Sequence, residues 1–283
     1  MAAGIVRGGL FKSLMAGLLL VGLTISARAE NAKYPDWSGS WNRRAGGTFD
    51  PSKPPGLGQQ APLNSEYQKV LEASVAAQAA GGQGNNPMAA CIPPGMPRMM
   101  ISYGGGLEFV ITPQITYVIQ GEPMLQLRRI YTDGRSWPDN VNASFSGYSI
   151  GKWESSKDDG SLDVLSVETR EIKGPRSYDS SGIPFHADNA TVVKERIFLN
   201  KMNPDILRNE TTVIDNALTR PWTVTRVYHR KRDPNWLETI CGEDEHQVKI
   251  GNEQYYLSGD GHLMPTRSNQ PPPDLRYFKD GAR

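Results

Sequence analysis

The chain has 283 residues and a formal net charge of +1, with 22% charged and 38% hydrophobic residues. Its mean hydropathy is −0.50. These values exclude a polytopic membrane protein, a coiled coil and a wholly disordered chain. Because the charge is near neutral, the chain offers no basic field for nucleic acid, and nucleic acid is not expected among its partners.

The first thirty residues are typical of an export signal. Arg7 and Lys12 supply a cationic start, Leu14–Ile25 is almost wholly apolar, and Ala27–Ala29 places small residues at a cleavage site. This order predicts a secretory signal peptide over residues 1–29 and a periplasmic or secreted protein. An uncleaved anchor is the alternative. The apolar run is short for a bilayer, so we expect no integral membrane span after cleavage.

Export changes the interpretation of the two cysteines, Cys91 and Cys241. In an oxidising compartment an even count favours a disulfide. This bond would close a loop that the chain-entropy model values at about 4–5 kcal/mol. Two buried free thiols are the alternative. A catalytic cysteine is not expected, because neither residue has a recognisable His/Asn frame.

The part of the chain that follows the signal is predicted to be a loop and then a helix. Residues 30–61 are polar and rich in turn residues, and Asp36–Trp41 within them is a candidate strand start. We predict one helix over Pro62–Ala80, because Ser65 and Gln68 have capping-box spacing and apolar residues recur on one face. The sequence GGQGNNP then ends it.

From residue 107 the sequence pattern changes to short runs of β-branched and aromatic residues that are separated by turn residues. The runs are Leu107–Thr112, Ile115–Gln120, Leu125–Tyr131, Tyr148–Glu154, Leu162–Thr169, Ala190–Leu199, Ile206–Ile214 and Trp222–Arg230. Such runs predict a mainly β chain whose antiparallel strands close into a barrel or sandwich. The predicted divisions are a signal peptide over 1–29, a loop and helix segment over 30–106, the β domain over 107–258 and an extended tail over 259–283.

Two resemblances refine this prediction. Gly39–Trp41 is similar to the G-x-W that opens the first strand of lipocalin-like barrels, which implies a β-barrel of the calycin type. The stretches CIPPGMPRMM (Cys91–Met100), RRIYTDGRSWP (Arg128–Pro138) and YSIGKWE (Tyr148–Glu154) resemble a family of exported bacterial proteins without an established activity. That resemblance implies export and a β-rich body, and it implies no catalytic role for any residue.

Strand alternation gives the best view of a site, because alternate side chains of a barrel strand point inward. We expect the more apolar face of each strand to look inward. The interior would then receive a set of ionisable and aromatic residues together with apolar ones. These are Arg129, Tyr131, Glu195, Trp222, Arg226 and Tyr228, and with less support Arg208 and Glu210.

This set suggests acid/base chemistry without a cofactor. Arg129 and Arg226 would hold a carboxylate, and Tyr131 and Tyr228 would position a phenol or carbonyl oxygen. Glu195 would move a proton, because burial raises the pKa of a carboxyl group. Arg208, Glu210 and Trp222 would complete substrate binding. The alternative is structural: these charges form cross-strand ion pairs or lie on the solvent face.

The histidines and cysteines suggest little further chemistry. His186 lies in a predicted loop beside Asp188 and is the histidine best placed to act as a general base. Cys241–His246 has the composition of a metal cluster, but Cys241 is expected to be oxidised. We find no H-E-x-x-H, C-x-x-C or EF-hand pattern, and we predict no metal and no cofactor.

Two functions of different kind remain, and the sequence favours the first, with the second as the alternative. The first is an exported, cofactor-independent enzyme of the lyase, decarboxylase or isomerase type that acts on a small aromatic or carboxylated metabolite. The second is a periplasmic lipocalin-like carrier or sensor that uses the same pocket without catalysis. Either function makes a small molecule the main partner, and the sequence leaves a homo-oligomer open.

Overall fold

The computed structural model describes residues 33–43, 61–101, 106–122, 124–157, 159–234, 241, 247–251, 253–258 and 260–273. The signal peptide expected over 1–29 lies outside these residues. Within the described parts, no helix has both the length and the apolar character that a membrane crossing requires.

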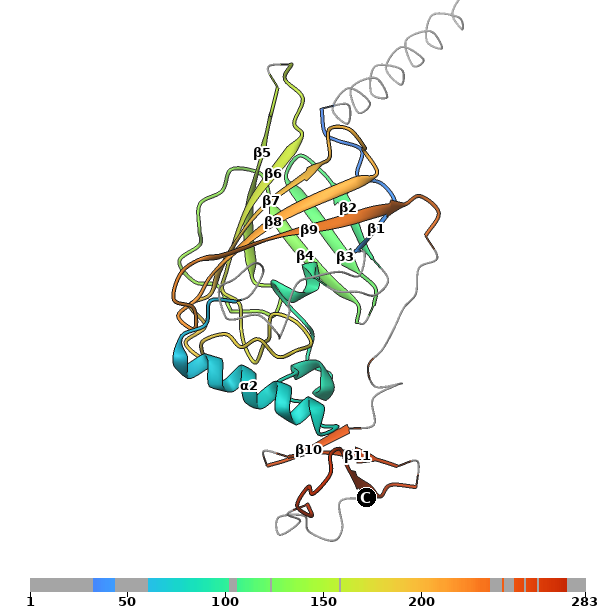
Figure 1. Ribbon diagram of the computed structural model, residues 1–283. Helices are drawn as coiled ribbons and strands as arrows, with labels where there is room; N and C mark the ends of the chain where they lie inside the picture. The colour runs from blue at the N-terminus through green and yellow to red at the C-terminus, as the bar shows by residue number, and fades with distance from the viewer. Residues whose placement is uncertain are drawn as a thin grey trace, which may run out of the picture.

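Nine strands close into a β-barrel, which confirms a mainly β, lipocalin-like fold (Figure 1). The strands are β1 (Ser40–Arg43), β2 (Leu107–Ile111), β3 (Ile115–Gln120), β4 (Gln126–Tyr131), β5 (Tyr148–Glu154), β6 (Val164–Arg170), β7 (Val192–Leu199), β8 (Ile206–Ile214) and β9 (Trp222–Lys231). Each strand pairs with the next along the chain, and β1 also pairs with β9. The closed order leaves the barrel without a free edge.

One strand pair departs from the antiparallel pattern. β4 and β5 run parallel and meet over only two residue pairs, Ile130 with Ser149 and Tyr131 with Ile150. Parallel neighbours need a long connection that returns to the starting end of the sheet, and residues 132–147 provide it. The barrel wall is therefore thin between β4 and β5, and it is thinner only between β1 and β2, which share the single pair Trp41 with Leu107.

The core occupies the barrel interior and both of its ends. Aromatic side chains pack around Trp37 at one end. The ring centre of Trp37 lies 5.0 Å from that of Phe109 and 5.0 Å from that of Trp153. Met96 and Met99 are fully buried in the same cluster. A second cluster packs around Tyr178 and Trp222 and includes Leu71 of the helix. The interior is thus apolar at both ends.

Gly95 allows the methionine-rich segment Met96–Met100 to pack into the core. Its backbone has a φ of +59°, and a Cβ at this position would lie 2.4 Å from the carbonyl oxygen of Phe145. The backbone N–H of Met96 donates to that same oxygen at 2.8 Å. Only glycine permits this approach, and Met96 and Met99, which follow it, are buried in the core.

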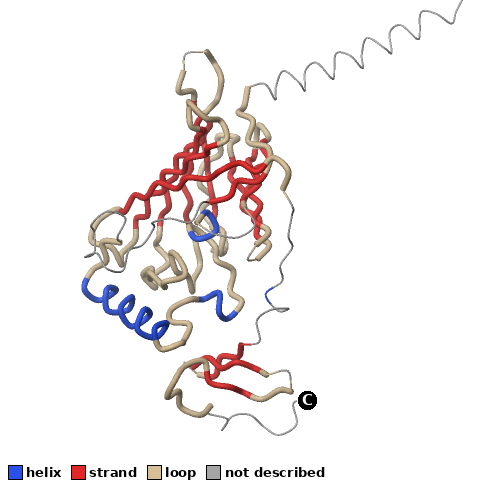
Figure 2. Tube along the Cα trace, turned by 45° about the vertical axis from the view of Figure 1, so that its right-hand side comes forward, coloured by secondary structure: helices blue, strands red, loops and turns tan. Residues whose placement is uncertain are grey.

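The helix α2 spans Ser65–Ala79 and lies across one end of the barrel (Figures 1 and 2). Its start differs from the expected capping box at Ser65. Asn64 caps the helix instead, and its side-chain oxygen accepts from the backbone N–H groups of Glu66 and Tyr67. Asn is as good a cap as Ser, and the helix begins one residue after it.

A second sheet lies beyond α2 and consists of β10 (Gln247–Ile250), β11 (Glu253–Leu257) and β12 (Leu263–Pro265) (Figures 1 and 2). This arrangement differs from a β domain over 107–258 followed by an extended tail over 259–283. The barrel closes when β9 pairs with β1, so no edge remains for later strands. The later strands pair with one another instead.

The expected disulfide between Cys91 and Cys241 is present, with Cα atoms 5.6 Å apart. Cys91 directly follows the short 3-10 helix Pro87–Ala90, and Cys241 precedes the second sheet. A hydrogen bond from the Gln83 side chain to the Tyr256 hydroxyl, at 3.1 Å, joins the same two regions. The disulfide therefore links the second sheet covalently to the segment beside α2.

Candidate functional site

An ion pair crosses the middle of the barrel. The side chains of Arg128 on β4 and Glu195 on β7 are both fully buried, and the Arg128 guanidinium donates to Glu195 Oε2. Arg128 also donates to Ser149 Oγ at 3.1 Å and to Thr169 Oγ1 at 2.8 Å. The Asn209 amide donates to the other oxygen of Glu195, Oε1, at 2.8 Å. Both carboxylate oxygens are therefore engaged.

The strand register brings more polar residues to the same height. Glu195 lies opposite Thr211, and Asn209 lies opposite Arg226. Directly opposed residues share one face of a sheet, so these side chains all look inward. We call this group the inner polar layer; it comprises Arg128, Ser149, Thr169, Glu195, Asn209, Thr211, Arg226 and Tyr228.

Arg226 and Tyr228 form the part of the layer contributed by β9. The Arg226 guanidinium is buried and donates to the hydroxyl of Tyr178 at 2.7 Å. Among the described residues, no carboxylate forms an ion pair with it. The Tyr228 hydroxyl donates to the carbonyl oxygen of Met100.

Burial sets the protonation of the two tyrosines. It raises the pKa of Tyr228 above its usual value, and the negative charge of Glu195 raises it further, against a smaller opposing effect of Arg226. Burial also raises the pKa of Tyr178, although Arg226 lowers it in part. Both phenols therefore stay neutral at physiological pH and act as hydrogen-bonding groups.

Several polar atoms of the layer have no hydrogen-bond partner within the described part of the chain. They are Arg128 Nη1, Arg226 Nε, Asn209 Oδ1 and Thr211 Oγ1. Buried polar groups are rarely left unpaired, and exceptions often mark water or ligand sites. Two guanidinium donors, one amide acceptor and one hydroxyl match a small molecule that carries an anionic oxygen group and a hydrogen-bond donor.

The structure corrects the predicted orientation of β4. Its buried residues are Gln126, Arg128 and Ile130, whereas Arg129 is exposed and Tyr131 is half-buried on the outside. We expected the more apolar face of this strand to look inward. The inward face is instead the one that supplies the counterion of Glu195, so a buried charge outweighed hydrophobicity.

The structure also corrects the predicted orientation of β8. Arg208 and Glu210 lie on the outer face, where Glu210 forms an ion pair with Arg196 at 3.5 Å. Asn209 and Thr211 take the inward positions. Both faces of β8 are half apolar, so hydrophobicity did not distinguish them, and the bond to Glu195 did.

Two further predicted residues lie away from the layer. His186 is partly exposed in the loop before β7, with its Nδ1 atom 2.9 Å from a carboxylate oxygen of Asp188 and its ring 5.4 Å from that of Tyr67. Trp222 is buried at the α2 end of the barrel, with its ring 4.3 Å from that of Tyr178. Of the residues predicted to be catalytic, Glu195 and Tyr228 alone share the layer.

Sequence reasoning missed Arg128 and Asn209, the two residues that hold Glu195. Arg128 and Arg129 are adjacent, so an inward face for one places the other outside. The register of β8 against β9 would have identified Asn209, because it lies opposite Arg226. That register depends on long-range pairing, which the pattern of a single strand does not contain.

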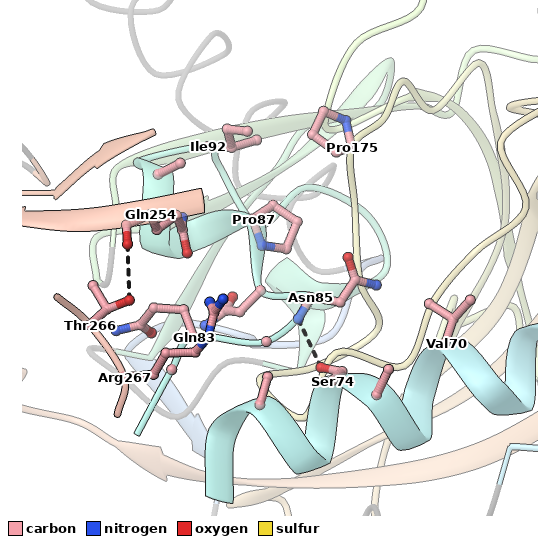
Figure 3. Close-up of a pocket in the computed structure, with 16 residues that line it drawn as sticks. Val70, Ser74, Gln83, Asn85, Pro87, Ile92, Pro175, Gln254, Thr266 and Arg267 are labelled. Carbon is pink, nitrogen blue, oxygen red and sulfur yellow. Dashed lines mark hydrogen bonds between the residues drawn. The ribbon is translucent and has the colours of Figure 1, made fainter. Parts of the chain in front are cut away.

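A hollow lies between α2 and the second sheet (Figure 3). Its volume is about 530 Å³, and its lining includes Val70 and Ser74 of α2, Gln254 of β11 and Thr266, which directly follows β12. Arg267 alone among its lining residues carries a charge, and both of its terminal nitrogens bond to Glu253, at 2.6 and 2.8 Å. None of the predicted site residues lies here, and the cavity presents no unpaired charge.

A smaller hollow of about 350 Å³ lies on the outer surface beside β4 and the start of β5. Arg129, Tyr131 and Tyr148 line it. The Tyr131 ring already contacts the guanidinium of Arg135, at 3.8 Å, and the ring of Tyr148, at 5.0 Å. Ring faces that are occupied in this way are not free to stack on a ligand.

The described residues contain no group of three or more His, Cys, Asp or Glu side chains arranged to hold a metal ion. His246, part of the Cys241–His246 stretch considered above, lies outside them. No family model, curated protein or solved structure matches the chain. The resemblance to a family of exported bacterial proteins therefore stays a prediction.

Proposed function

We propose that the chain is an exported barrel protein that binds a small carboxylated molecule at the inner polar layer. The buried guanidinium of Arg226 carries this proposal, because no described carboxylate pairs with it. Burial of an unpaired charge is costly. A ligand carboxylate would offset that cost, since arginine binds carboxylates through two parallel hydrogen bonds.

The other unpartnered atoms support the same ligand class. A second donor on the ligand, such as a hydroxyl group, would satisfy Asn209 Oδ1, and Arg128 Nη1 would bind a further oxygen. The apolar cluster that contains Trp153 and Ile197 adjoins the layer on the same strands. An aromatic or hydrocarbon body would pack there, which matches the usual composition of ligand sites.

Binding without catalysis is supported better than an enzyme. Both oxygens of Glu195 are engaged, one by Arg128 and one by Asn209, so the carboxylate is held as an acceptor. His186 and Tyr131, the other expected catalytic groups, lie outside the layer. A carrier or sensor needs only the recognition groups that the layer contains.

An enzyme is the second candidate, because Glu195 and Tyr228 lie in the same layer as the proposed carboxylate partner. In this reading Arg128 transfers its hydrogen bond from Glu195 to the substrate. Glu195 then moves the proton of a decarboxylation, elimination or isomerisation, and Tyr228 holds the substrate oxygen.

Calorimetric titration tests the proposal with a panel of aromatic and aliphatic carboxylates, each measured beside its neutral amide. We expect at least one carboxylate to bind about tenfold or more tightly than its amide, and Arg226→Gln to remove that difference. Arg196→Gln, on the outer face of β7, is the matched control and should change binding less than about twofold. Equal binding of acid and amide, or an unaffected Arg226→Gln variant, would contradict the proposal.

Mass spectrometry of the same mixtures separates the two candidates. Recovery of unchanged ligand assigns a carrier or sensor. A product that disappears in Glu195→Gln, with the far-UV circular dichroism spectrum retained, assigns an enzyme.

A further inference from the structure

The outer surface of the barrel differs sharply between its two halves. On β6 to β8 most outward charges are paired: Glu168 contacts Arg170 at 2.5 Å and Lys194 at 3.4 Å, and Glu210 contacts Arg196 at 3.5 Å. Arg208 of β8 is the exception among the described residues. On β2 to β4 the outward side chains are mainly apolar. We call this second surface the β2–β4 outer face; it comprises Glu108, Val110, Tyr117, Ile119, Leu125, Leu127 and Arg129.

Three large hydrophobic side chains of this face are exposed to solvent. Val110 is 47% exposed, Leu125 57% and Leu127 47%, and these residues make up three of the seven large hydrophobics exposed in the described chain. Cross-strand pairing makes the surface continuous, because Leu127 lies opposite Ile119. Contiguous exposed apolar patches mark interaction surfaces.

Two charges on the face lack partners. Glu108 lies opposite Ile119, which lies opposite Leu127; Arg129 lies two residues farther along β4. Within the described part of the chain neither Glu108 nor Arg129 forms an ion pair or a side-chain hydrogen bond. Partial burial alone raises the pKa of Glu108. Each of these two side chains can therefore form an ion pair with an opposite charge on another molecule.

We propose that the β2–β4 outer face is a self-association surface whose partner is a second copy of this chain. The acid and the arginine occupy opposite corners of the face, with β3 between them. A two-fold axis that lies in the plane of contact and crosses over β3 exchanges these corners. Glu108 of each protomer then meets Arg129 of the other, and the apolar residues of the two faces pack together.

The charge pattern favours a second copy over other partners. The face carries one positive and one negative group, so it complements itself when it is rotated by the two-fold axis. An anionic lipid surface would attract the arginine and repel the acid equally. Three short strands form a small contact area, so we expect a weak, concentration-dependent dimer rather than an obligate one.

Sedimentation velocity of the exported protein, from about 1 to 200 µM, tests the proposal. We expect a monomer–dimer equilibrium that Leu127→Lys weakens about tenfold or more, and that the matched control Met202→Lys leaves unchanged. Met202 is 94% exposed and lies away from this face, in the connection between β7 and β8.

Charge reversal gives the decisive arm of the experiment. Glu108→Arg and Arg129→Glu should each prevent self-association, because like charges then face each other twice. An equimolar mixture of the two variants should form a heterodimer, since both contacts again join opposite charges. A wild type that stays monomeric, or a mixture that does not associate while each variant keeps the wild-type melting temperature, overturns the proposal.

Discussion

Glu195 and Arg196 are neighbours in β7, yet each belongs to an arginine–glutamate pair of a different kind. Glu195 points inward to Arg128, and both side chains are fully buried. Arg196 points outward to Glu210, and these side chains are 47% and 41% exposed. The same two residue types therefore face water on one side of the sheet and a buried interior on the other.

This difference shows that the surroundings, more than the residue types, determine what an ion pair does. In water, the attraction between two charges is screened and the pair contributes little. In the interior, both charges have lost their hydration, so each depends on the other and on added hydrogen bonds. Ser149, Thr169 and Asn209 supply those bonds to the inner pair, and the outer pair has none that the structure describes.

The largest expected effect comes from breaking the inner pair. Glu195→Ala leaves the buried Arg128 guanidinium without its counterion and should lower the free energy of unfolding by about 3–5 kcal/mol. Urea denaturation of the purified protein measures this loss. Arg128→Met should cost a similar amount, because it leaves Glu195 unpaired instead.

The double variant Arg128→Met with Glu195→Leu distinguishes pairing from packing. Replacement of both charges by apolar side chains of similar volume removes the unpaired group, so we expect the double variant to be more stable than either single one. Additive losses in the double variant would mean that the two residues contribute by shape rather than by charge.

The next effect concerns Tyr228, which shares the interior with this pair. Its pKa is raised above the usual value of about 10, mainly by burial, so the folded state keeps the neutral phenol. Its contribution to stability is complete below the unfolded pKa and is lost as pH rises toward the folded pKa. Each pH unit between the unfolded and the folded pKa of Tyr228 lowers the free energy of unfolding by about 1.4 kcal/mol.

Melting temperatures measured from neutral pH to about pH 12 should therefore fall steeply above pH 10. Tyr228→Phe should flatten that fall, although it loses the hydrogen bond to the Met100 carbonyl and starts from a lower stability. Tyr117→Phe, on the outer face of β3, is the control and should leave the slope unchanged. A slope that is identical in wild type and Tyr228→Phe would contradict the assignment.

The sequence predicts the positions of the strands well, and it predicts less well which face of each strand points into the barrel. The bounds of β3, β5 and β8 match the prediction, because apolar and β-branched runs between turn residues are local signals. On β7 and β9 the inward faces were also predicted, since one face is clearly more apolar. The disulfide was predicted from export and the cysteine count.

The candidate site was predicted only in part, for a physical reason. Glu195, Arg226 and Tyr228 lie on faces that carry apolar neighbours, so alternation placed them inside. On β4 the inward positions hold Gln126 and Arg128 beside Ile130, and Leu127 lies on the outward face. A polar interior beside an apolar exterior inverts the usual rule, and only the partner strands reveal it.

The smallest expected effect concerns the outer pair and completes the comparison. Glu210→Gln removes the contact with Arg196 on a surface where both side chains are more than 40% exposed. We expect the free energy of unfolding to change by less than about 1 kcal/mol, and the change to shrink further in about 1 M salt. Denaturation of Glu210→Gln and Glu195→Gln in parallel, at low and high salt, measures both. A loss in Glu210→Gln as large as that in Glu195→Gln would show that exposure does not separate the two pairs. A salt-independent loss in Glu195→Gln alone is the result that burial predicts, because mobile ions do not reach the barrel interior.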